Sequence, residues 1–272
     1  MPDDEWLAAN RSKWDDRTEV HLRSQFYDVE GWLRDERGPQ EWEIEAIGDV
    51  AGLRLVHLQC HFGLDTLSWA RRGAEVTGLD FSLPAIEAAE ELARRAGLSE
   101  RARFVCADVY EAASALAHQT FDIVYVSLGA LCWLPSVERW AAQIAALLRP
   151  GGRLYLHDQH PLCWALSFEE PVIEHTYFEE DAPFVEDSTM TYTDAYRALV
   201  ATRSFEWNHS LGEIVNSLVG HGLRIDRLDE HDWTLWLRYP WLQKDNQGRW
   251  RPPPDRPRIP LSFTVLATAV GT

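Results

Sequence analysis

The sequence predicts an α/β domain built around a mostly parallel β-sheet, and three observations support this fold class. Short apolar runs of strand length alternate with segments of helical periodicity from Leu53 onward. The runs are apolar throughout, as strands covered by helices on both faces of a parallel sheet are. The helical segments between them are long enough to return the chain to the start of the next parallel strand. We therefore expect seven strands, six parallel and the seventh antiparallel, with helices on both faces.

The first half of this domain contains five expected strands. They cover Leu53–Leu58, Glu75–Asp80, Ala102–Cys106, Phe121–Ser127 and Gly152–His157. The helices between them begin or end at residues that favour helix termini. Gly73 ends a helix that begins at Leu64, and Ser82 with Pro84 opens the next one. A further helix is expected over Ser136–Leu148.

The pattern continues with a helix over Leu211–Val219 and two last strands, Leu223–Asp232 and Leu261–Val270. Residues 1–50 show no strand pattern and carry tryptophans among helix-forming residues, which indicates two or three short helices packed on the rest of the chain. We therefore expect an N-terminal helical cap segment at 1–50 and the α/β domain at 51–272.

Two long irregular segments interrupt the alternation. Residues 169–196 contain nine acidic residues and no Lys or Arg, and residues 240–260 contain six of the fourteen prolines. The acidic segment is either a solvated loop or a cap, because loops of this length in compact domains are usually functional or disordered. Ligands of open parallel sheets bind beyond the carboxyl ends of the strands. We expect insertions at about 159–207 and 234–260 to meet there, together with residues 1–50, over a ligand pocket.

Composition and charge limit the class of partner. The chain of 272 residues has 26 Lys and Arg against 43 Asp and Glu, a formal charge of −17. Nucleic acids and anionic membranes are bound through surplus positive charge, so we expect neither as a partner. We find no apolar run of membrane-spanning length and no leader-like N-terminus. We therefore expect a cytoplasmic protein that is a monomer or a homodimer.

The four cysteines are scattered along the chain, and no two form a Cys-x-x-Cys pair. Reduced, mostly buried thiols are expected in a reducing compartment. The window His157–Cys163 contains two histidines and a cysteine, but no second ligand cluster lies at metal-binding spacing. We therefore predict no bound metal.

The loop after the first strand indicates the type of cofactor. It reads His-Leu-Gln-Cys-His-Phe-Gly over residues 57–63, and Asp80 ends the second strand 17 residues past Gly63. An acidic side chain at about this distance commonly binds the two ribose hydroxyls of a nucleoside cofactor. A pyrophosphate needs bare glycine backbone at a helix N-terminus, whereas this loop carries bulky Gln59, His61 and Phe62. These residues favour an adenosine cofactor without phosphates.

Four motifs, all between residues 50 and 160, carry a resemblance to a known family. They are VHLQCHFGLDTLSWARRGAEVTGLDFSLPAIEAA, FVCADVYE, FDIVYVSLGALCWL and LLRPGGRLYL. In this order and spacing the chain resembles the class I S-adenosylmethionine-dependent methyltransferases. Residues 10–15 and 206–209 resemble a bacterial subgroup that methylates small molecules. The resemblance implies a Rossmann-like fold and S-adenosyl-L-methionine as cofactor, with S-adenosyl-L-homocysteine as product.

The first loop departs from the family pattern, in which an acidic residue is followed by three alternate glycines. His57 stands at the acidic position, Gln59 and His61 replace two glycines, and Gly63 keeps the third. We expect Gln59, with Asp65 or Thr66, to hold the methionyl group in place of the glycine backbone. The alternative for Gln59 and His61 is an ordinary loop role with hydrogen bonds to backbone.

The resemblance implies a cofactor site at the carboxyl ends of the first four strands. Asp80 corresponds to the ribose-binding acid, Asp108 with Val109 to the adenine-binding pair, and Ser127 with Leu128 to the loop that lines the methyl donor. The N-terminal Trp14 and Tyr27 either close over the donor or only pack. The implied set in the domain is Gln59, His61, Gly63, Asp65, Thr66, Asp80, Phe81, Ser82, Asp108, Val109, Ser127 and Leu128.

Methyl transfer is an in-line displacement with an already activated leaving group, so the protein aligns the reactants and in some cases removes a proton. Histidine is the natural base near neutral pH. We rank His160 and His157, which follow or end the fifth strand, ahead of His209 as catalytic residue. The alternative for each is a structural hydrogen bond. Glu206 and Tyr192 are weaker candidates.

The predicted function is methyl transfer from S-adenosylmethionine to the oxygen, nitrogen or carbon of a small-molecule acceptor. A nucleic-acid methyltransferase is disfavoured by the charge and by residues 127–130, which read Ser-Leu-Gly-Ala and not Asn- or Asp-Pro-Pro-Tyr. Two different functions are also compatible with the sequence. One is that of a Rossmann-like module that binds the cofactor or a partner without catalysis, and the other is that of a nicotinamide-dependent reductase.

Overall fold

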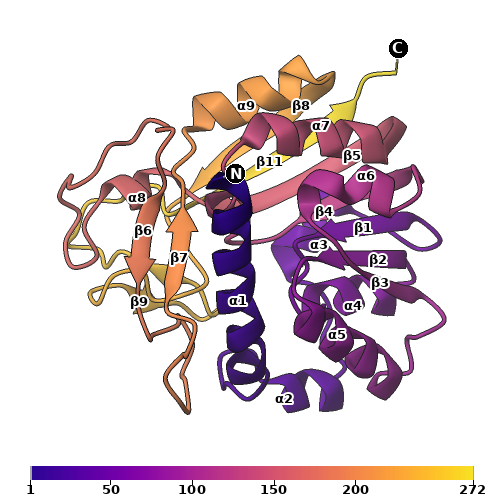
Figure 1. Ribbon diagram of the computed structural model, residues 1–272, viewed down its shortest axis with the longest axis horizontal. Helices are drawn as coiled ribbons and strands as arrows, with labels where there is room; N and C mark the ends of the chain where they lie inside the picture. Colours follow the sequence, from indigo (N-terminus) through magenta and orange to yellow (C-terminus); the bar gives the residue numbers. More distant parts are fainter. Residues whose placement is uncertain (1, 272) are drawn as a thin grey trace.

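A seven-stranded sheet forms the centre of the molecule in the computed structural model, which describes residues 2–271. The strand order is β3-β2-β1-β4-β5-β11-β8, and β11 runs antiparallel to both of its neighbours. The prediction of six parallel strands and an antiparallel seventh is therefore confirmed (Figure 1). The strands are β1 (Arg54–Leu58), β2 (Glu75–Asp80), β3 (Ala102–Cys106), β4 (Phe121–Val126), β5 (Leu148–Gln159), β8 (Leu223–His231) and β11 (Ser262–Ala269).

Helices cover both faces of this sheet because side chains of successive strand residues point to opposite faces. On one face, Leu154 and Leu156 of β5 pack with α7 (Val137–Leu147) and α9 (Leu211–Gly220). On the other face, Tyr155 of β5 and Leu55 of β1 pack with α4 (Leu64–Arg71). The helix α5 (Leu83–Arg95) covers β3 beside α4, whereas the short helices η1 (Val109–Glu111) and α6 (Ala112–Ala115) lie beside α7. Figure 1 shows the two helical layers on opposite sides of the sheet.

Serine hydroxyls define where three of these helices begin. Ser82, Ser136 and Ser210 each accept the backbone N–H of the residue three positions on, at the start of α5, α7 and α9. Such a cap replaces one of the hydrogen bonds that the first turn lacks, typically with about 1 kcal/mol. The predicted helix starts at Ser82 and Ser136 therefore agree with the structure to within one residue.

The N-terminal segment forms three helices, α1 (Pro2–Leu22), α2 (Val29–Arg34) and α3 (Glu41–Ile47). The expectation of short helices is wrong for α1, which has 21 residues. The sequence of α1 shows no apolar periodicity from which its length could be predicted, because several of the side chains that the helix buries are polar or charged. Asn10 shows how it is held: its amide donates to the Phe205 carbonyl and accepts from the Phe205 N–H, both at 2.8 Å.

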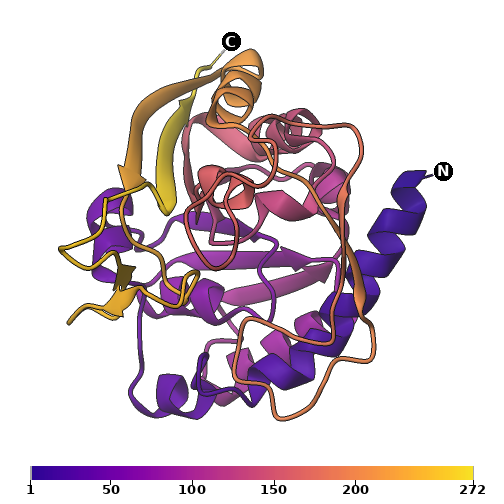
Figure 2. The ribbon, with the colours of Figure 1, turned by 90° about the vertical axis from the view of Figure 1, so that its left-hand side faces the viewer.

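The two insertions lie at the carboxyl ends of the parallel strands and contain short regular elements that the sequence did not predict. The first holds α8 (Leu162–Ala165) and the hairpin β6 (Phe184–Asp187) and β7 (Arg203–Glu206), and the second holds β9 (Gln243–Lys244) and β10 (Trp250–Arg251). The segment joining β6 and β7 runs beside α1, as Figure 2 shows in orange against indigo. A further 3-10 turn, η2 (Leu131–Trp133), follows β4.

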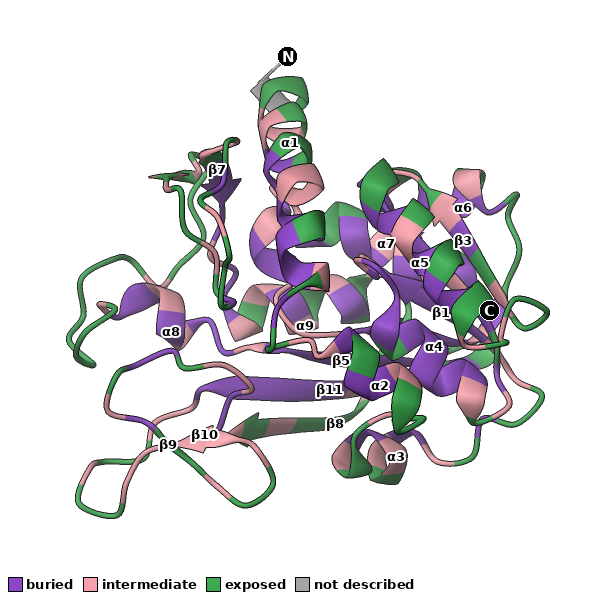
Figure 3. Ribbon diagram, turned by 90° about the horizontal axis from the view of Figure 1, so that it is seen from below, coloured by how far each residue is buried: buried purple, intermediate pink, exposed green. Residues whose placement is uncertain are grey.

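Burial follows this arrangement. The strands at the centre of the sheet are buried, whereas the edge strand β8 and much of both insertions are exposed (Figure 3). Many of the side chains that β8 turns to solvent are charged, and two pairs lie along the strand, Arg224 with Asp226 and Arg227 with Asp229. Among residues 2–271, no helix combines the length and apolar character that a membrane span requires.

Candidate active site

The backbone of the first loop has an alternating left-handed conformation. Gln59, His61 and Gly63 have φ values of 56°, 50° and 76°. These are the three positions at which the resemblance implied alternate glycines, so the loop keeps a glycine-type path with two larger residues in it. A left-handed conformation costs a residue with a Cβ atom roughly 1–2 kcal/mol. At Gly63 a Cβ atom would also lie 2.7 Å from the Phe104 ring, so only glycine fits there.

The two larger loop residues reach different neighbours. The Gln59 amide donates to the Ala130 carbonyl after β4 at 2.8 Å, which ties the first loop to the fourth-strand loop. The His61 ring lies against α1, with its Nε2 2.9 Å from Nδ1 of His21. One side-chain atom of each, Gln59 Oε1 and His61 Nδ1, is buried without a hydrogen-bond partner. The loop therefore presents two polar atoms that its own surroundings leave unsatisfied.

Asp80 lies at the end of β2 beside this loop and is 6% exposed. One carboxylate oxygen accepts the His61 N–H at 2.8 Å and the other accepts the Ser82 N–H at 2.9 Å. Burial raises the pKa of the Asp80 carboxyl to about 6 against the effect of these two donors, and the nearby Asp15 of α1 adds to the rise. Asp15 also has a buried oxygen, Oδ1, without a partner. Two carboxylates from distant parts of the chain thus converge at this strand end.

A buried histidine connects the first loop, α4 and the loop after β4. His57 Nδ1 lies 2.8 Å from the Thr66 hydroxyl and Nε2 lies 3.1 Å from the Ser127 hydroxyl. The Ser127 hydroxyl in turn donates to Asp65 at 3.3 Å. Burial lowers the pKa of His57 to about 3, so the ring is neutral and bridges two hydroxyls. The network brings together Asp65, Thr66 and Ser127, as a common site for the methionyl group requires.

The loop after β4 is held by Asp158, a residue to which the sequence alone assigned no role. Its carboxylate accepts the backbone N–H groups of Gly129, Ala130 and Leu131 and also that of Gln159. Asp158 is 3% exposed, and burial raises the pKa of its carboxyl although the four donors act in the opposite direction. Asp158 lies near the end of β5 between the candidates His157 and His160. Its position at a strand end is the sequence feature from which a role in the site could have been predicted.

The remaining predicted cofactor residues lie at the same edge of the sheet. Asp108 follows β3 and caps η1, where it accepts the Tyr110 N–H at 2.9 Å, and Val109 is buried in the core. Phe81 follows Asp80 and lies under the guanidinium of Arg11 on α1, 5.9 Å from its ring centre. Leu128 lies in the loop between Ser127 and Gly129.

Aromatic residues of α1 and the following turn cover the first loop. The Trp14 ring stands edge-on to His61 at 5.2 Å and to Trp133 at 5.3 Å between ring centres. The Tyr27 hydroxyl is hydrogen-bonded to that of Tyr192 in the first insertion. His21 adds a second link to the same insertion, with Nε2 2.7 Å from the Thr191 hydroxyl. Both predicted N-terminal residues therefore lie over the loop.

The three histidines predicted as catalytic are engaged in hydrogen bonds to different degrees. His160 accepts the Leu162 N–H at Nδ1 and lies 2.9 Å from Glu230 at Nε2, and His209 contacts Glu213 and donates to the Leu134 carbonyl. His157 contacts Thr264 through Nδ1, and its Nε2 is buried without a partner. Burial lowers the pKa of His157 to about 3, and the nearby His231 adds to the effect.

Two buried ionisable residues, one on α1 and one beside it, received little weight from the sequence. Arg17 was given no role, and Glu206 was a weaker candidate for the base. Arg17 is 5% exposed, and its guanidinium lies over Trp14 and Trp133. Glu206, at the end of β7, is 6% exposed. Burial raises the pKa of Glu206 to about 7 and Glu186 adds to the rise, whereas the charges of Arg17 and Lys13 oppose it. Arg17 lies three residues after Trp14, a spacing that places both on one face of a helix. This spacing is the sequence feature from which their contact could have been predicted.

A small recess adjoins the fourth-strand loop, and its free volume of about 20 Å³ is enough for one water molecule. Its walls combine residues of this loop with the ends of β5 and β11 and with the first insertion. They are Gly129, Leu131, Cys132, Asp158, Gln159, Pro161, Trp164, Trp207, Asn208, His209, Ile214 and Phe263. The lining is aromatic and apolar with a few polar groups, but its free volume is far below the roughly 300–1,000 Å³ of a small-molecule pocket.

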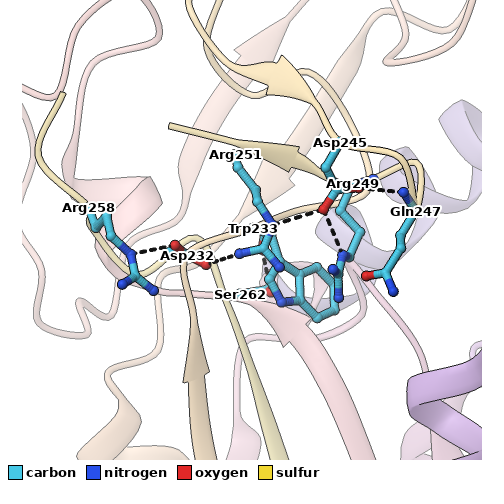
Figure 4. Close-up of polar contacts among 8 residues, drawn as sticks. All are labelled: Asp232, Trp233, Asp245, Gln247, Arg249, Arg251, Arg258 and Ser262. Carbon is cyan, nitrogen blue, oxygen red and sulfur yellow. Dashed lines mark hydrogen bonds and ion pairs between the residues drawn. The ribbon is translucent and has the colours of Figure 1, made fainter. Parts of the chain in front are cut away.

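The second insertion is fixed by paired charges. Asp232 binds Arg251 and Arg258, and Asp245 binds Arg249 and Arg251, as Figure 4 shows. The Ser262 hydroxyl donates to the Trp233 carbonyl at 2.6 Å. Each charge drawn in this cluster has an opposite partner, so the cluster anchors the β9–β10 hairpin to the ends of β8 and β11. None of the groups predicted for the cofactor or for catalysis belongs to it.

Comparison with known proteins finds similarity to methyltransferases over part of the chain. Residues 56–156 match the model of a methyltransferase domain. The chain is 31% identical over 108 residues to methyltransferase phqN of Penicillium fellutanum, covering 39% of this chain and 32% of that protein. It is 30% identical over 139 residues to a ubiquinone biosynthesis O-methyltransferase of Aeromonas salmonicida, covering 50% and 57%. The chain thus spans between about a third and somewhat over half of the length of these relatives.

Solved structures share the fold at low sequence identity. A SAM-dependent methyltransferase from Methanosarcina mazei has a TM-score of 0.58 at 19% identity, covering 86% of this chain and all of that one. One from Mesorhizobium loti has a TM-score of 0.53 at 22% identity, covering 83% and 95%. These likenesses confirm the predicted Rossmann-like architecture over most of the molecule. Residues 56–156 match a methyltransferase domain, and the chain shares its fold with S-adenosylmethionine-dependent methyltransferases of known structure.

Proposed function

We propose that this chain transfers a methyl group from S-adenosylmethionine to a small-molecule acceptor. The observation that supports this most is the left-handed backbone at Gln59, His61 and Gly63 beside Asp80. Two of these residues hold a conformation that is unfavourable outside glycine. Backbone strain of this kind concentrates at ligand-binding sites, where the surrounding structure maintains it. The loop therefore has the left-handed backbone conformation of a glycine-rich cofactor loop, although Gln59 and His61 stand at two of the glycine positions.

The polar groups at the sheet edge fit an adenosine. Each oxygen of Asp80 accepts one backbone N–H, and a carboxylate oxygen has room for a second donor. The remaining acceptor position on each Asp80 oxygen would take one of the two ribose hydroxyls. Asp108 with Val109 would hold the adenine. Gln59, Asp65 and Ser127 would meet the methionyl group. The unpartnered Gln59 Oε1 and Asp15 Oδ1 supply further acceptors for its donors.

The residues of the chain have three tasks in the reaction. When bound, S-adenosylmethionine supplies a methyl group on an activated sulfonium, so the protein needs chiefly to align the acceptor and to exclude water. Asp158 keeps residues 129–131 rigid at the edge of the site through its backbone hydrogen bonds. Trp14 and Trp133 cover the first loop. For proton removal, His157 is the one predicted histidine with a ring nitrogen free of hydrogen bonds.

The small-molecule acceptor is supported by charge and by the relatives. A chain with a formal charge of −17 lacks the cationic surface that nucleic acid requires. Relatives over about half of the chain include an O-methyltransferase of ubiquinone biosynthesis. The aromatic side chains of Trp164, Trp207 and Phe263 near Gly129 are of the kind on which a flat apolar acceptor stacks.

Calorimetry on the purified protein tests the donor part of this proposal. S-adenosylhomocysteine should bind and NADH should not. Asp80→Ala should weaken S-adenosylhomocysteine roughly tenfold or more, since hydrogen bonds to a charged group contribute about 1.5–3 kcal/mol. Asp122→Asn, at the opposite edge of the sheet, is the control and should bind normally. Unchanged affinity in Asp80→Ala would refute the ribose assignment.

A turnover screen tests the reaction. Release of S-adenosylhomocysteine from S-adenosylmethionine should be measured with aromatic and amino-acid-like metabolites as acceptors. Turnover with one of them supports the enzyme, and substitution of His157, His160 and His209 by alanine then ranks the predicted bases. Tight donor binding without turnover across a broad panel supports a non-catalytic binding module.

A further inference from the structure

Arg17 is a buried cation without a charged partner. It lies on α1 and is 5% exposed, and its guanidinium carbon stands 5.0 Å from the ring centre of Trp14 and 5.3 Å from that of Trp133. Its Nε is buried and makes no hydrogen bond. Within residues 2–271, no carboxylate oxygen lies within 4.0 Å of a guanidinium nitrogen of Arg17, the distance limit for an ion pair. Within the described part of the chain, the guanidinium is therefore in contact with two aromatic faces and with no carboxylate.

Such an arrangement is costly unless a ligand completes it. Taking a charge out of water without a partner costs several kcal/mol, and contacts with aromatic faces return only part of this. Lys13, one turn earlier on α1, shows how the same helix treats a buried cation with a structural role. Lys13 is fully buried, and its amino group contacts Glu186 at 2.7 Å and Ser204 at 2.9 Å. The chain thus pairs one buried cation of α1 and leaves the next unpaired.

The position of Arg17 relates it to the proposed site. Trp14, on which it lies, contacts His61 of the first loop, and Trp133 follows the fourth-strand loop. Burial lowers the pKa of His61 and the charge of Arg17 adds to this effect, whereas at Glu206 the same charge opposes the rise that burial causes. The charge of Arg17 therefore acts on both sides of this junction. Glu206 is the nearby acid and stays outside ion-pair distance. The unpaired guanidinium therefore lies where the donor and the acceptor would meet.

We propose that Arg17 binds a ligand carboxylate at this junction, an inference that rests on the proposed methyltransferase function. A guanidinium offers two parallel N–H donors that match the two oxygens of a carboxylate. Two sources supply this chemistry. One is the methionyl carboxylate of the donor, and the other is a carboxylate on the acceptor. In both cases the binding of an anion completes a charge pair that the protein alone lacks.

The donor arm compares two ligands that differ in the amino-acid tail. S-adenosylhomocysteine carries the carboxylate, whereas 5′-methylthioadenosine keeps the adenosine and thioether and lacks it. Calorimetry should be run on the wild type, Arg17→Met and Arg17→Lys, with Arg23→Met as the matched control. Arg23 directly follows α1, is exposed and pairs with Glu19 of the helix. If Arg17 binds the donor, Arg17→Met should weaken S-adenosylhomocysteine about tenfold to a hundredfold and leave methylthioadenosine unchanged, with Arg17→Lys between them.

The acceptor arm uses simple probes on protein saturated with S-adenosylhomocysteine. Benzoate and its uncharged counterpart benzamide are titrated into the wild type and Arg17→Met. If Arg17 binds the acceptor, the affinity for S-adenosylhomocysteine is unchanged in the variant, while benzoate binds the wild type in preference to benzamide and Arg17→Met removes that preference. If the variant alters neither the donor nor the benzoate affinity, the proposal is overturned. Failure of the wild type to bind S-adenosylhomocysteine would instead overturn the proposed function.

Thermal unfolding without ligand separates a binding role from a packing role. A buried cation held ready for a ligand destabilises the free protein, so Arg17→Met should unfold at a temperature equal to or above that of the wild type. A residue kept for its contacts with Trp14 and Trp133 would give the opposite result. A lower unfolding temperature combined with unchanged carboxylate binding therefore also refutes the proposal.

Discussion

Asp158→Asn tests how strongly one carboxylate organises the loop after β4. In the structure one oxygen accepts the N–H groups of Gly129 and Gln159, and the other accepts those of Ala130 and Leu131. Asparagine keeps one acceptor oxygen and turns an NH₂ group toward the remaining two N–H groups. Each buried donor left unpaired costs about 1–3 kcal/mol, so the free energy of unfolding should fall by about 2–6 kcal/mol. This is a large part of the 5–15 kcal/mol that stabilises a typical domain.

Urea unfolding and calorimetry with S-adenosylhomocysteine measure the two consequences. We expect a lower unfolding midpoint with an unchanged slope, together with weaker donor binding, because residues 127–131 lose their anchor. Asp122→Asn is the matched control: Asp122 accepts the Arg54 N–H and pairs with Arg149, at the amino edge of the same sheet. It should cost less stability and leave donor binding intact. A loss below about 1 kcal/mol in Asp158→Asn, or equal donor affinity in the two variants, would contradict the reasoning.

Three further outcomes are expected. Because burial raises the pKa of Glu206 from 4.5 to about 7, this carboxyl favours the folded state when protonated, and that contribution is lost as pH rises from about 4.5 through 7. Glu206→Gln should therefore unfold like the wild type near pH 4.5 and be more stable by about 3 kcal/mol at pH 8, whereas a difference that does not vary with pH would contradict the burial argument. Turnover should survive a chelator, and its loss with recovery on adding Mg²⁺ or Zn²⁺ would direct attention to His157–Cys163. Limited proteolysis should cut first within 169–196 or 240–260, with S-adenosylhomocysteine protecting at least one segment, and early cleavage elsewhere would argue against a mobile cap.

The sheet could be predicted because its signal is local. Buried parallel strands are apolar runs, and six of the seven strands agree with the expected bounds to within one residue at each end, whereas β5 begins four residues earlier than expected. The N-terminal helix could not be predicted in length, since Asn10, Lys13 and Arg17 look like surface residues until β7 is placed beside them. Its partner lies almost two hundred positions away, beyond the reach of periodicity.

The candidate site was accessible to sequence reasoning only in part. Asp80 and Ser127 follow apolar runs, so their place at the sheet edge follows from the fold. Histidine was sought as a base by its intrinsic pKa, but burial and hydrogen bonding engage both ring nitrogens of His160 and His209. Asp158, which lies between His157 and His160 in the sequence, was given no role. The four backbone N–H groups from which it accepts hydrogen bonds are brought together only in the folded loop.

The pairing of Asn10 with Phe205 has a consequence for how the protein is made. These hydrogen bonds join residues 195 positions apart, and α1 leaves the ribosome before β7. At about 5–20 residues per second, roughly 10–40 s pass before β7 is synthesised. During this time α1 exposes Lys13 and Arg17 to water and has no apolar face with which to misassociate. Because α1 is polar, it can remain unpacked in water until β7 has been synthesised. The N-terminal side of the proposed donor site is therefore completed after the strands that it covers have emerged.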